Sequence, residues 1–471
     1  MIPPVTLSLT GAQHDRIRHF LYPGDDNEAV VLLLCGRRAA ERRHRLLVRD
    51  IHEIPYRACS VRSSSRVTWP PEIIEPLLER AADQQLSVIK IHSHPCGYAD
   101  FSATDNIGDR QLLPMIQGWV EADIPHGSAV MLPDGQMFGR VLSPGCTFNP
   151  ISVINVVGDN LCFWYSDTST TEVPGFAASY AQAFGAGTTE RLRRLSVAVI
   201  GCSGTGGPVV EQLYRNGVGD LLLVDDDYIE ERNVNRIPNS TMDDAHRKRY
   251  KVDVLADAVK RAGLGTKVSV LRKSLWHPEV VEAVAQCDVV FGCMDTIDGR
   301  FLLNALATYY TLPYFDIGIR LDAVPNGADK GRIREVCGTI HYIQPDRSSL
   351  MSRGLFSLRQ VAEQGLRRND PTAYIQQVRD GYISGVDEHR PAVNTVNTLA
   401  ASLAVHEFLA RLHPYREEPN NVYASVTFSL ASMELLSEAE QPHCQILKDC
   451  VGVGDSEPLL GLTELARKHF G

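Results

Sequence analysis

The chain has 471 residues, which exceeds one ordinary domain and predicts two or three, each large enough to bury its own core. With 44% hydrophobic and 22% charged residues the composition is globular, which excludes a disordered, collagen-like or coiled-coil chain. A formal net charge of −10 disfavours nucleic acid as a partner, because phosphate binding needs a basic face.

The sequence predicts a cytoplasmic protein. Its first residues, Met1-Ile-Pro-Pro4, do not show the basic segment followed by an apolar segment that marks a secretory signal. The longest apolar run, Ala29–Cys35, is far shorter than a membrane span. An odd number of cysteines, 11, without a signal peptide indicates reduced thiols.

The first part of the chain, residues 1–167, is predicted to be a small α/β or α+β domain. A helix is predicted over 72–82 after Pro70-Pro71, with apolar residues at helical spacing. The polar segment 168–175, which contains Pro and Gly, is the predicted linker. Short apolar runs separated by turn signals indicate strands at Ala29–Cys35, Leu46–Ile54, Leu86–His92 and Ala129–Met131.

A candidate metal site follows the third of these runs. His92 and His94, two residues apart at a strand end, point the same way and can share one metal ion, and Asp105 can return through a turn as a third ligand. Three protein ligands leave a fourth position for water, as in a catalytic zinc site. Ser102 is placed to donate a hydrogen bond to the oxyanion of an attacked carbonyl. The alternative is a strand-end histidine pair with an unrelated downstream Asp.

The spacing His92-x-His94-x7-Ser102-x2-Asp105 resembles the signature of the JAMM (JAB/MPN+) zinc isopeptidases over most of residues 1–150. The resemblance implies Zn²⁺ bound by the two histidines and Asp105. It also implies an upstream Glu before an apolar strand that takes a proton from the zinc-bound water. Glu28 occupies that place, and Glu53, which follows the second predicted strand, is the competing carboxylate.

From about residue 176 the pattern changes to longer alternation of strands and helices, predicted at 196–200, 208–216, 221–224, 288–291 and 314–317. Strands separated by helices imply a mostly parallel, doubly wound sheet. A long helix of small and apolar residues is predicted over 392–412. The whole chain is therefore predicted to be α/β, with two domains over 1–167 and 176–471.

A glycine-rich turn between the first of these strands and its helix contains Gly201, Gly204 and Gly206. Glycines in this context let backbone amides approach phosphates at a helix N-terminus. Asp225 ends the next strand, about 20 residues on, where a carboxylate suits hydrogen bonding to ribose hydroxyls. These features alone are typical of a dinucleotide-dependent oxidoreductase.

The residues after Asp225 favour a different family. They resemble the D-x-D…N-x-x-R element of the ThiF/MoeB adenylyltransferases, relatives of ubiquitin-activating enzymes, over roughly 188–320. The resemblance implies a Rossmann-like domain that binds ATP and Mg²⁺, in which Arg and Lys hold the phosphates while a carboxylate attacks the α-phosphate. The residues that match are Asp225, Asp227, Asn233, Arg236, Lys251 and Asp295, with Arg236 and Asp295 closest to the chemistry.

The sequence departs from that family at three places. No Arg occurs in 176–185, where relatives carry one that crosses a dimer, and Arg191, Arg193 or Arg194 would have to replace it. Serines stand in 345–352, where the resemblance leads us to expect a zinc-binding Cys-x-x-Cys pair. Because Cys444 and Cys450 are also too widely spaced for such a pair, no structural zinc is expected in this half. A thioester would need Cys337, Cys444 or Cys450, since no Cys lies between Cys337 and Cys444.

Both resemblances imply the same class of substrate, the C-terminus of a ubiquitin-like protein. We therefore expect a bifunctional prokaryotic enzyme that trims or releases this C-terminus and adenylates its carboxylate for conjugation. Sulfur transfer to a carrier protein, for cofactor or siderophore synthesis, is one alternative. A protease with a non-catalytic binding domain is another. The expected partners are a ubiquitin-like or sulfur-carrier protein ending in glycine, a conjugating enzyme or sulfur donor, and a second copy through the adenylation domain.

Overall fold

The computed structural model describes residues 3–143, 145–169, 175–324, 331–380, 383 and 393–467. These residues form two compact units, each described by itself below. The first contains Met1–Ser169 with two later segments, Tyr309–Thr311 and Cys450–Ser456, and the second contains the rest. Within the described ranges, no helix is both long and apolar enough to cross a membrane.

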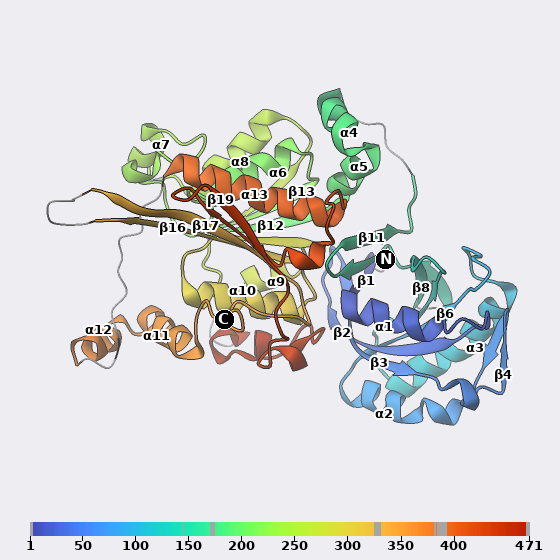
Figure 1. Ribbon diagram of the computed structural model, residues 1–471. Helices are drawn as coiled ribbons and strands as arrows, with labels where there is room; N and C mark the ends of the chain where they lie inside the picture. Colours follow the sequence, from blue (N-terminus) through green and yellow to red (C-terminus); the bar gives the residue numbers. More distant parts are fainter. Residues whose placement is uncertain are drawn as a thin grey trace. The chain divides into compact units, whose positions relative to one another are not determined.

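The first unit is built on a nine-stranded mixed sheet with the order β11-β10-β1-β3-β2-β6-β7-β8-β9. Three helices accompany it in Figure 1, α1 (Gly11–Leu21), α2 (Glu75–Asp83) and α3 (Ala103–Val120). The strands are β1 (Val5–Thr10), β2 (Val30–Arg38), β3 (His44–Glu53), β6 (Ser87–Ser93), β7 (Gly127–Met131), β8 (Met137–Ser143), β9 (Thr147–Pro150), β10 (Val153–Val157) and β11 (Leu161–Tyr165), with β4 (Val61–Ser63) and β5 (Arg66–Thr68) as a separate hairpin.

Both faces of this sheet are covered, which the alternation along β2 shows. Val31 and Leu33 pack with Ile17 of α1, whereas Val30 and Leu32 pack with residues of α2 and α3 on the opposite face. Successive side chains of a strand point to opposite faces, so a strand between two helical layers must be apolar at every position. This explains why the run that starts at residue 29 is continuous rather than alternating.

The second unit contains an eight-stranded sheet with the order β14-β13-β12-β15-β16-β17-β18-β19. Its first five strands are parallel and the last three antiparallel. The bounds are β12 (Ser196–Ile200), β13 (Asp220–Val224), β14 (Lys267–Leu271), β15 (Val289–Gly292), β16 (Tyr314–Ala323), β17 (Ile333–Ile343), β18 (Ser425–Ser429) and β19 (Glu434–Glu438).

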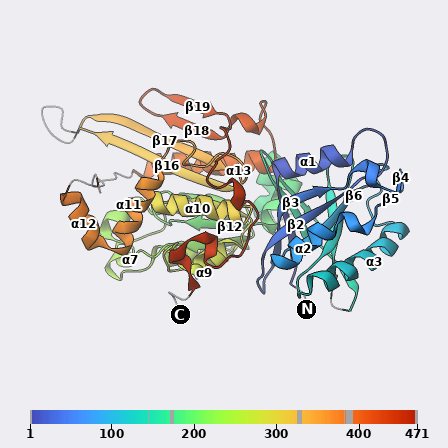
Figure 2. The same ribbon diagram turned by 90° about the horizontal axis from the view of Figure 1, so that it is seen from below.

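Helices cover both faces of this second sheet, with α6, α8 and α13 on one face and α9 and α10 on the other (Figure 1). Figure 2, seen from below, shows the face that carries α9 and α10. This confirms the predicted doubly wound arrangement. The helices are α4 (Ala178–Phe184), α5 (Ala186–Arg194), α6 (Gly206–Arg215), α7 (Met242–His246), α8 (Lys251–Ala262), α9 (Pro278–Val284), α10 (Ile297–Tyr309), α11 (Leu358–Asn369), α12 (Pro371–Arg379) and α13 (Asn394–Leu412).

The structure differs from the sequence predictions mainly at boundaries. The helix predicted over 72–82 is a short 3-10 turn, Pro71–Ile73, followed by α2 with Pro76 in its first turn, where a missing N–H costs nothing. The predicted linker 168–175 lies mostly outside the described residues. The late segments Tyr309–Thr311 and Cys450–Ser456 belong to the first unit, whereas the sequence placed them in the second domain.

Candidate functional site

The two histidines and the aspartate singled out in the sequence converge in the first unit. His92 lies at the end of β6, His94 follows it, and Asp105 lies in the first turn of α3. His92 Nε2 is 2.8 Å from Asp105 Oδ1 and 3.2 Å from His94 Nε2, and His94 Nε2 is 3.3 Å from Asp105 Oδ2. All three residues are buried, between 2% and 9% exposed.

The start of α3 is held in place by its own capping residues. Ser102 is the N-cap, and its hydroxyl accepts a hydrogen bond from the Asp105 N–H at 3.1 Å. The Ser102 N–H donates in return to Asp105 Oδ2 at 2.7 Å. This reciprocal capping fixes the Asp105 carboxylate relative to the helix axis.

The distances among the two histidine Nε2 atoms and the two Asp105 carboxylate oxygens are of the size expected between ligands of one tetrahedral metal ion. Two ligands about 2.0–2.1 Å from zinc at a tetrahedral angle are about 3.3 Å apart, close to the separations found here. His94 Nδ1 lies 2.7 Å from the carbonyl oxygen of Tyr98, which places the ring proton on Nδ1 and leaves Nε2 free to bind. Burial by itself raises the pKa of Asp105, but hydrogen bonds from His92, His94 and Ser102 outweigh it and keep the carboxylate charged.

Glu28 is the carboxylate that best fits the role of proton acceptor beside His92, His94 and Asp105. In the antiparallel pair of β2 and β6, Val30 lies opposite His92, so the register places Glu28 opposite His94. Burial, with the nearby Asp105 charge, raises the pKa of Glu28 to about 7, the range of a general base or acid at neutral pH. Glu53, the alternative, is instead paired with Arg16 Nε at 2.8 Å. The geometry favours Glu28.

The glycine-rich turn of the second unit is tightly packed. Gly201 has φ +86°, and a Cβ at Gly206 would lie 1.9 Å from the Gly201 carbonyl oxygen. Only glycine can therefore close this turn between β12 and α6. The turn lies at the carboxyl end of β12. In the sheet, β13 and β14 lie on one side of β12 and β15 lies on the other, so the strand order reverses at this point. Ligands of doubly wound sheets bind at such a switch point.

The carboxylates after β13 meet the turn and a lysine. Asp225 Oδ2 accepts a hydrogen bond from the Cys202 N–H at 2.7 Å, and its Oδ1 lies 3.7 Å from Lys251 Nζ. Lys251, at the start of α8, also forms an ion pair with Asp227. Asp225, Asp226 and Asp227 bring carboxylate oxygens within 4.8 Å of one another, a donor set that suits Mg²⁺. Gly201, Asp225, Asp227 and Lys251 are thus brought together as the sequence predicted.

Arg236 reaches the same turn through its aliphatic stem. A Cβ at Gly204 would lie 3.1 Å from Arg236 Cδ, while the guanidinium donates to the carbonyl oxygen of Arg232. Asn233 is buried and accepts a hydrogen bond from the Glu230 N–H at 3.0 Å, so it caps its own turn. Its contact with a nucleotide stays a prediction.

Asp295 follows β15, which pairs in parallel with β12. Cys293, two residues earlier, packs against the turn, because a Cβ at Gly201 would lie 2.8 Å from its carbonyl oxygen. Asp295 is exposed and lies at the same edge of the sheet as Asp225.

Sequence reasoning missed Asn397, which also contacts the glycine-rich turn. This residue of α13 is 4% exposed and donates from Nδ2 to Thr205 Oγ1 at 3.2 Å. Its Nδ2 would lie 2.6 Å from a Cβ at Gly204. No local pattern marks Asn397, because it follows Thr205 by 192 residues and meets it only through the packing of α13 on α6.

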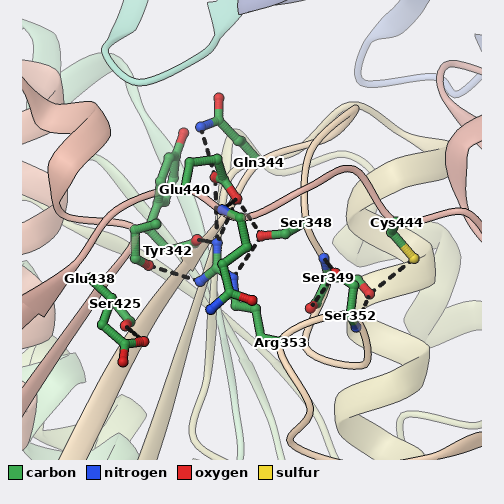
Figure 3. Close-up of polar contacts among 12 residues, drawn as sticks. Tyr342, Gln344, Ser348, Ser349, Ser352, Arg353, Ser425, Glu438, Glu440 and Cys444 are labelled. Atoms are coloured by element: carbon green, nitrogen blue, oxygen red, sulfur yellow. Dashed lines mark hydrogen bonds and ion pairs between the residues drawn. The ribbon is translucent and has the colours of Figure 1, made fainter.

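The region where the resemblance led us to expect a Cys-x-x-Cys pair is a hydrogen-bonded corner, drawn in Figure 3. Ser349 Oγ lies 3.0 Å from Cys444 Sγ and accepts from the Ser352 N–H at 3.1 Å. Beside it, Arg353 donates to the carbonyl oxygen of Tyr342 at 2.9 Å and pairs with Glu440 at 3.3 Å. These contacts join β17 to the segment after β19 within the second unit.

The three cysteines considered for a thioester have different surroundings. Cys444 is buried in the corner just described, and Cys450 belongs to the segment packed with the first unit. Burial and the neighbouring Glu335 carboxylate raise the pKa of the Cys337 thiol, which disfavours the nucleophilic thiolate. Of the arginines considered as replacements, Arg191 donates to the carbonyl oxygen of Leu412 at 3.1 Å and Arg194 pairs with Glu190 at 2.7 Å.

Comparison with known proteins assigns the second unit. A sequence model of the ThiF family matches residues 176–446. The chain is 26% identical to ubiquitin-like modifier-activating enzyme 5 of Culex quinquefasciatus over 211 residues, which cover 42% of this chain and 49% of that protein.

Two further relatives match over shorter regions. SAMP-activating enzyme E1 of Haloferax volcanii is 32% identical over 123 residues, 26% of this chain and 45% of that protein. Adenylyltransferase and sulfurtransferase MOCS3 of Caenorhabditis briggsae is 31% identical over 130 residues, 28% and 32% of the two chains. The chain therefore spans less than half the length of each of these relatives.

Proposed function

This chain belongs to the ThiF family, and from that membership we propose that it uses ATP to adenylate the C-terminal carboxylate of a ubiquitin-like protein. The observation that supports this most is the convergence of the glycine-rich turn, Asp225 and Lys251 at the switch point of the sheet. The relatives named above include a ubiquitin-like modifier-activating enzyme, which favours the same class of substrate.

The proposed reaction needs positive charge and fixed geometry. A carboxylate oxygen of the substrate attacks the α-phosphorus of ATP, the bond to the β-phosphate oxygen breaks, and pyrophosphate leaves. Amides of the turn after Gly201 and the Lys251 ammonium stabilise the phosphates, while Asp225 is placed for the ribose. Asp226 and Asp227 would offer oxygen ligands to Mg²⁺, which supplies charge neutralisation at the phosphates when bound.

The test of the adenylation proposal is ATP binding, measured by calorimetry with Lys251→Met. We expect the affinity for ATP to fall at least about tenfold, because a lost charge-assisted contact costs about 1.5–3 kcal/mol. Lys260→Met, on the exposed face of the same helix α8, is the matched control and should bind ATP like the wild type. Equal ATP affinity in the Lys251→Met variant would contradict the proposed site.

Pyrophosphate exchange then tests the chemistry. Wild-type protein with ATP and a ubiquitin-like protein ending in glycine should exchange labelled pyrophosphate into ATP. A chain that binds ATP without exchange, while its hydrolytic activity is intact, would favour the alternative of a protease with a non-catalytic binding unit.

We further propose that the first unit is a zinc-dependent hydrolase of the JAMM type that cleaves amide bonds at the same C-terminus. The carrying observation is the close approach of the His92, His94 and Asp105 side chains, at separations that suit the ligands of one zinc ion, with the Glu28 carboxylate nearby. Zinc held there would polarise a bound water and lower its pKa towards neutrality. Glu28, buried and with a raised pKa, is placed to accept and return a proton, and the Ser102 hydroxyl, at the start of α3 beside Asp105, is the group proposed to stabilise an oxyanion.

Elemental analysis tests the metal centre. We expect about one zinc per wild-type chain and loss of that zinc in a His92→Ala/His94→Ala double variant. Glu28→Gln should keep the zinc and lose cleavage of a ubiquitin-like fusion, whereas Glu53→Gln should keep both. Stoichiometric zinc in the double variant would place the metal elsewhere, and full cleavage by Glu28→Gln would move the proton acceptor to Glu53.

The destination of the adenylate separates two versions of this function. Conjugation requires transfer to a thiol of a partner, whereas sulfur transfer requires a sulfur donor and yields a thiocarboxylate. Because one relative is an adenylyltransferase and sulfurtransferase, the experiment should also test for sulfur transfer. Mass spectrometry of the ubiquitin-like product after incubation with ATP and sulfide distinguishes a thiocarboxylate from an unmodified terminus. The remaining proposed features are a cytoplasmic location and a homodimer through the second unit.

A further inference from the structure

A second layer of buried polar contacts lies one helical turn beyond Asp105. Asp109 follows Asp105 by four residues in α3, so both side chains lie on the same face of the helix. Lys90 precedes His92 by two residues in β6, so both lie on the same side of the strand. Lys90 and Asp109 form an ion pair, and His92 contacts Asp105. The same strand and helix are therefore joined twice, first by the proposed metal ligands and then by this pair.

Asp109 receives donors from three neighbouring strands. Lys90 comes from β6, Ser128 from β7 and Arg140 from β8, and these strands are adjacent in the sheet. Arg140 donates to Asp109 Oδ2 from Nη2 at 2.6 Å and from Nε at 3.2 Å. The Asp109 side chain is fully buried. This one carboxylate therefore joins α3 to three strands through hydrogen bonds.

Arg140 also contacts residues at the beginning of α3. Its Nη1 donates to Asn106 Oδ1 at 2.5 Å, and its guanidinium lies 3.7 Å from the centre of the Phe101 ring. Phe101 immediately precedes the N-cap Ser102. The same guanidinium is 4.3 Å from the centre of the ring of Phe148 in β9, so the cation contacts two aromatic rings.

The contacts of Asp109 cannot be exchanged for others without moving the helix. Burial by itself raises the pKa of Asp109, but Lys90, Ser128 and Arg140 outweigh it and keep the carboxylate charged. Neutralising it would leave two buried cations without their anion, and buried charges without a partner are strongly destabilising. A shift of α3 would relieve them, and it would move Asp105, which lies one turn earlier in the same helix.

We propose that Asp109, together with Arg140, is a positioning residue for the metal centre: it sets where α3 places Asp105 and Ser102 relative to His92 and His94. This inference rests on the proposed zinc site. Outer residues that orient metal ligands typically change metal affinity 10–100-fold when they are substituted. A general core ion pair would instead change stability without changing the affinity for the metal.

The test measures the zinc dissociation constant of the full chain by competition with a chelator. We expect Asp109→Asn to weaken zinc binding at least about tenfold. The matched control is Glu407→Gln in the second unit, since Glu407 is likewise buried and is held by Arg411 and Arg416. That control should lose stability but keep the wild-type zinc affinity. The visible spectrum of the Co²⁺-substituted protein should change in Asp109→Asn and not in Glu407→Gln.

Arg140→Lys is the second variant, and it carries the test if Asp109→Asn does not fold. It retains the positive charge but loses the second hydrogen bond to Asp109 and the contacts with the Phe101 and Phe148 rings. Its zinc affinity should therefore lie between those of the wild type and Asp109→Asn. If Asp109→Asn folds and binds zinc as tightly as the wild type, this inference is wrong while the proposed metal centre stands. If Asp109→Asn does not fold, wild-type zinc affinity in Arg140→Lys gives the same result. A wild-type chain that binds no zinc would overturn the proposed metal centre and this inference with it.

Discussion

The histidines of the first unit show how surroundings decide what one residue type does. His92 and His94 turn Nε2 towards a carboxylate and towards each other, which suits a cation. His126 is fully buried, and its Nδ1 accepts a hydrogen bond from the Val88 N–H at 3.0 Å, which requires a neutral ring. Burial, with the charge of Arg37, lowers the pKa of His126 to about 4.

His126 should make the first unit acid-sensitive. The pKa in the unfolded chain is near 6.5, so between pH 6.5 and 4 the unfolded state binds a proton that the folded state does not. This contribution to stability is complete above pH 6.5 and is lost as the pH falls to about 4. Between pH 7 and pH 5 we expect a loss of about 2 kcal/mol, measured by urea unfolding.

The control compares the pH dependence of two variants. In His126→Gln, which keeps an acceptor for the Val88 N–H, the difference in stability between pH 7 and pH 5 should shrink by this amount. In His246→Gln, at an exposed histidine, it should match the wild type. Unfolding can be followed by fluorescence, because Trp69, Trp119 and Trp164 lie in the first unit. An unchanged pH dependence in His126→Gln would contradict the argument.

At the scale of elements, two helices begin at the two proposed sites for different reasons. Side-chain capping by Ser102 orients α3. By contrast, α6 has no side-chain cap and begins directly from the glycine-rich turn. The Gly207 N–H donates to the Ser203 carbonyl oxygen at 2.8 Å, so the backbone of the turn itself closes the start of this helix. Glycines accordingly have different functions in the two helices: a Cβ at Gly206 would collide with the Gly201 carbonyl oxygen, whereas one at Gly118 of α3 would meet nothing within 4 Å.

Alanine at these two positions should have opposite effects. Gly118→Ala should stabilise the protein by about 0.5–1 kcal/mol, because alanine loses less backbone entropy in a helix. Gly206→Ala should displace the turn, lower stability and weaken ATP binding. Thermal unfolding with and without ATP measures both effects. A Gly206→Ala variant with wild-type ATP affinity would show that the turn does not hold the phosphates.

At the scale of the whole molecule, the first unit is assembled from distant parts of the chain. The segment Cys450–Ser456 runs beside β2, and a Cβ at Gly36 would lie 2.2 Å from the Gly452 carbonyl oxygen. Asp455 accepts hydrogen bonds from Arg38 Nη1 at 3.2 Å and from the Tyr310 hydroxyl at 3.1 Å. The first unit is therefore complete only when residues 450–456 have joined it.

Asp455→Ala should lower the stability of the first unit by about 1–2 kcal/mol, since two side-chain hydrogen bonds are lost from a partly buried site. Hydrogen exchange of β2 peptides should rise in this variant. Asp449→Ala, at an exposed position just outside the segment, is the control and should leave exchange in β2 unchanged. Unchanged exchange in both variants would show that the segment does not stabilise β2.

Local patterns in the sequence were sufficient to predict much of the fold of the second unit. The strand Ser196–Ile200, the glycine-rich turn and the acid after the next strand are all close in the chain, and their physics is the local geometry of a strand–turn–helix unit. The convergence of His92, His94 and Asp105 was also predictable, because 13 residues carry the chain from His92 to Asp105 and the histidines share one side of a strand. Boundaries were less accurate, because capping and proline positions decide them.

The sequence by itself determined the class of fold, the two groups of candidate site residues and their order along the chain. Only the tertiary structure gave a reason to favour Glu28 over Glu53, because the pairing of β2 with β6 carries Glu28 towards the histidines, while Glu53 pairs with Arg16. It alone brought Asn397 to the glycine-rich turn, Cys444 to Ser349 and Arg140 to Asp109. The reason is physical: local sequence dictates turns and amphipathic faces, whereas contacts between distant segments are set by which faces pack together.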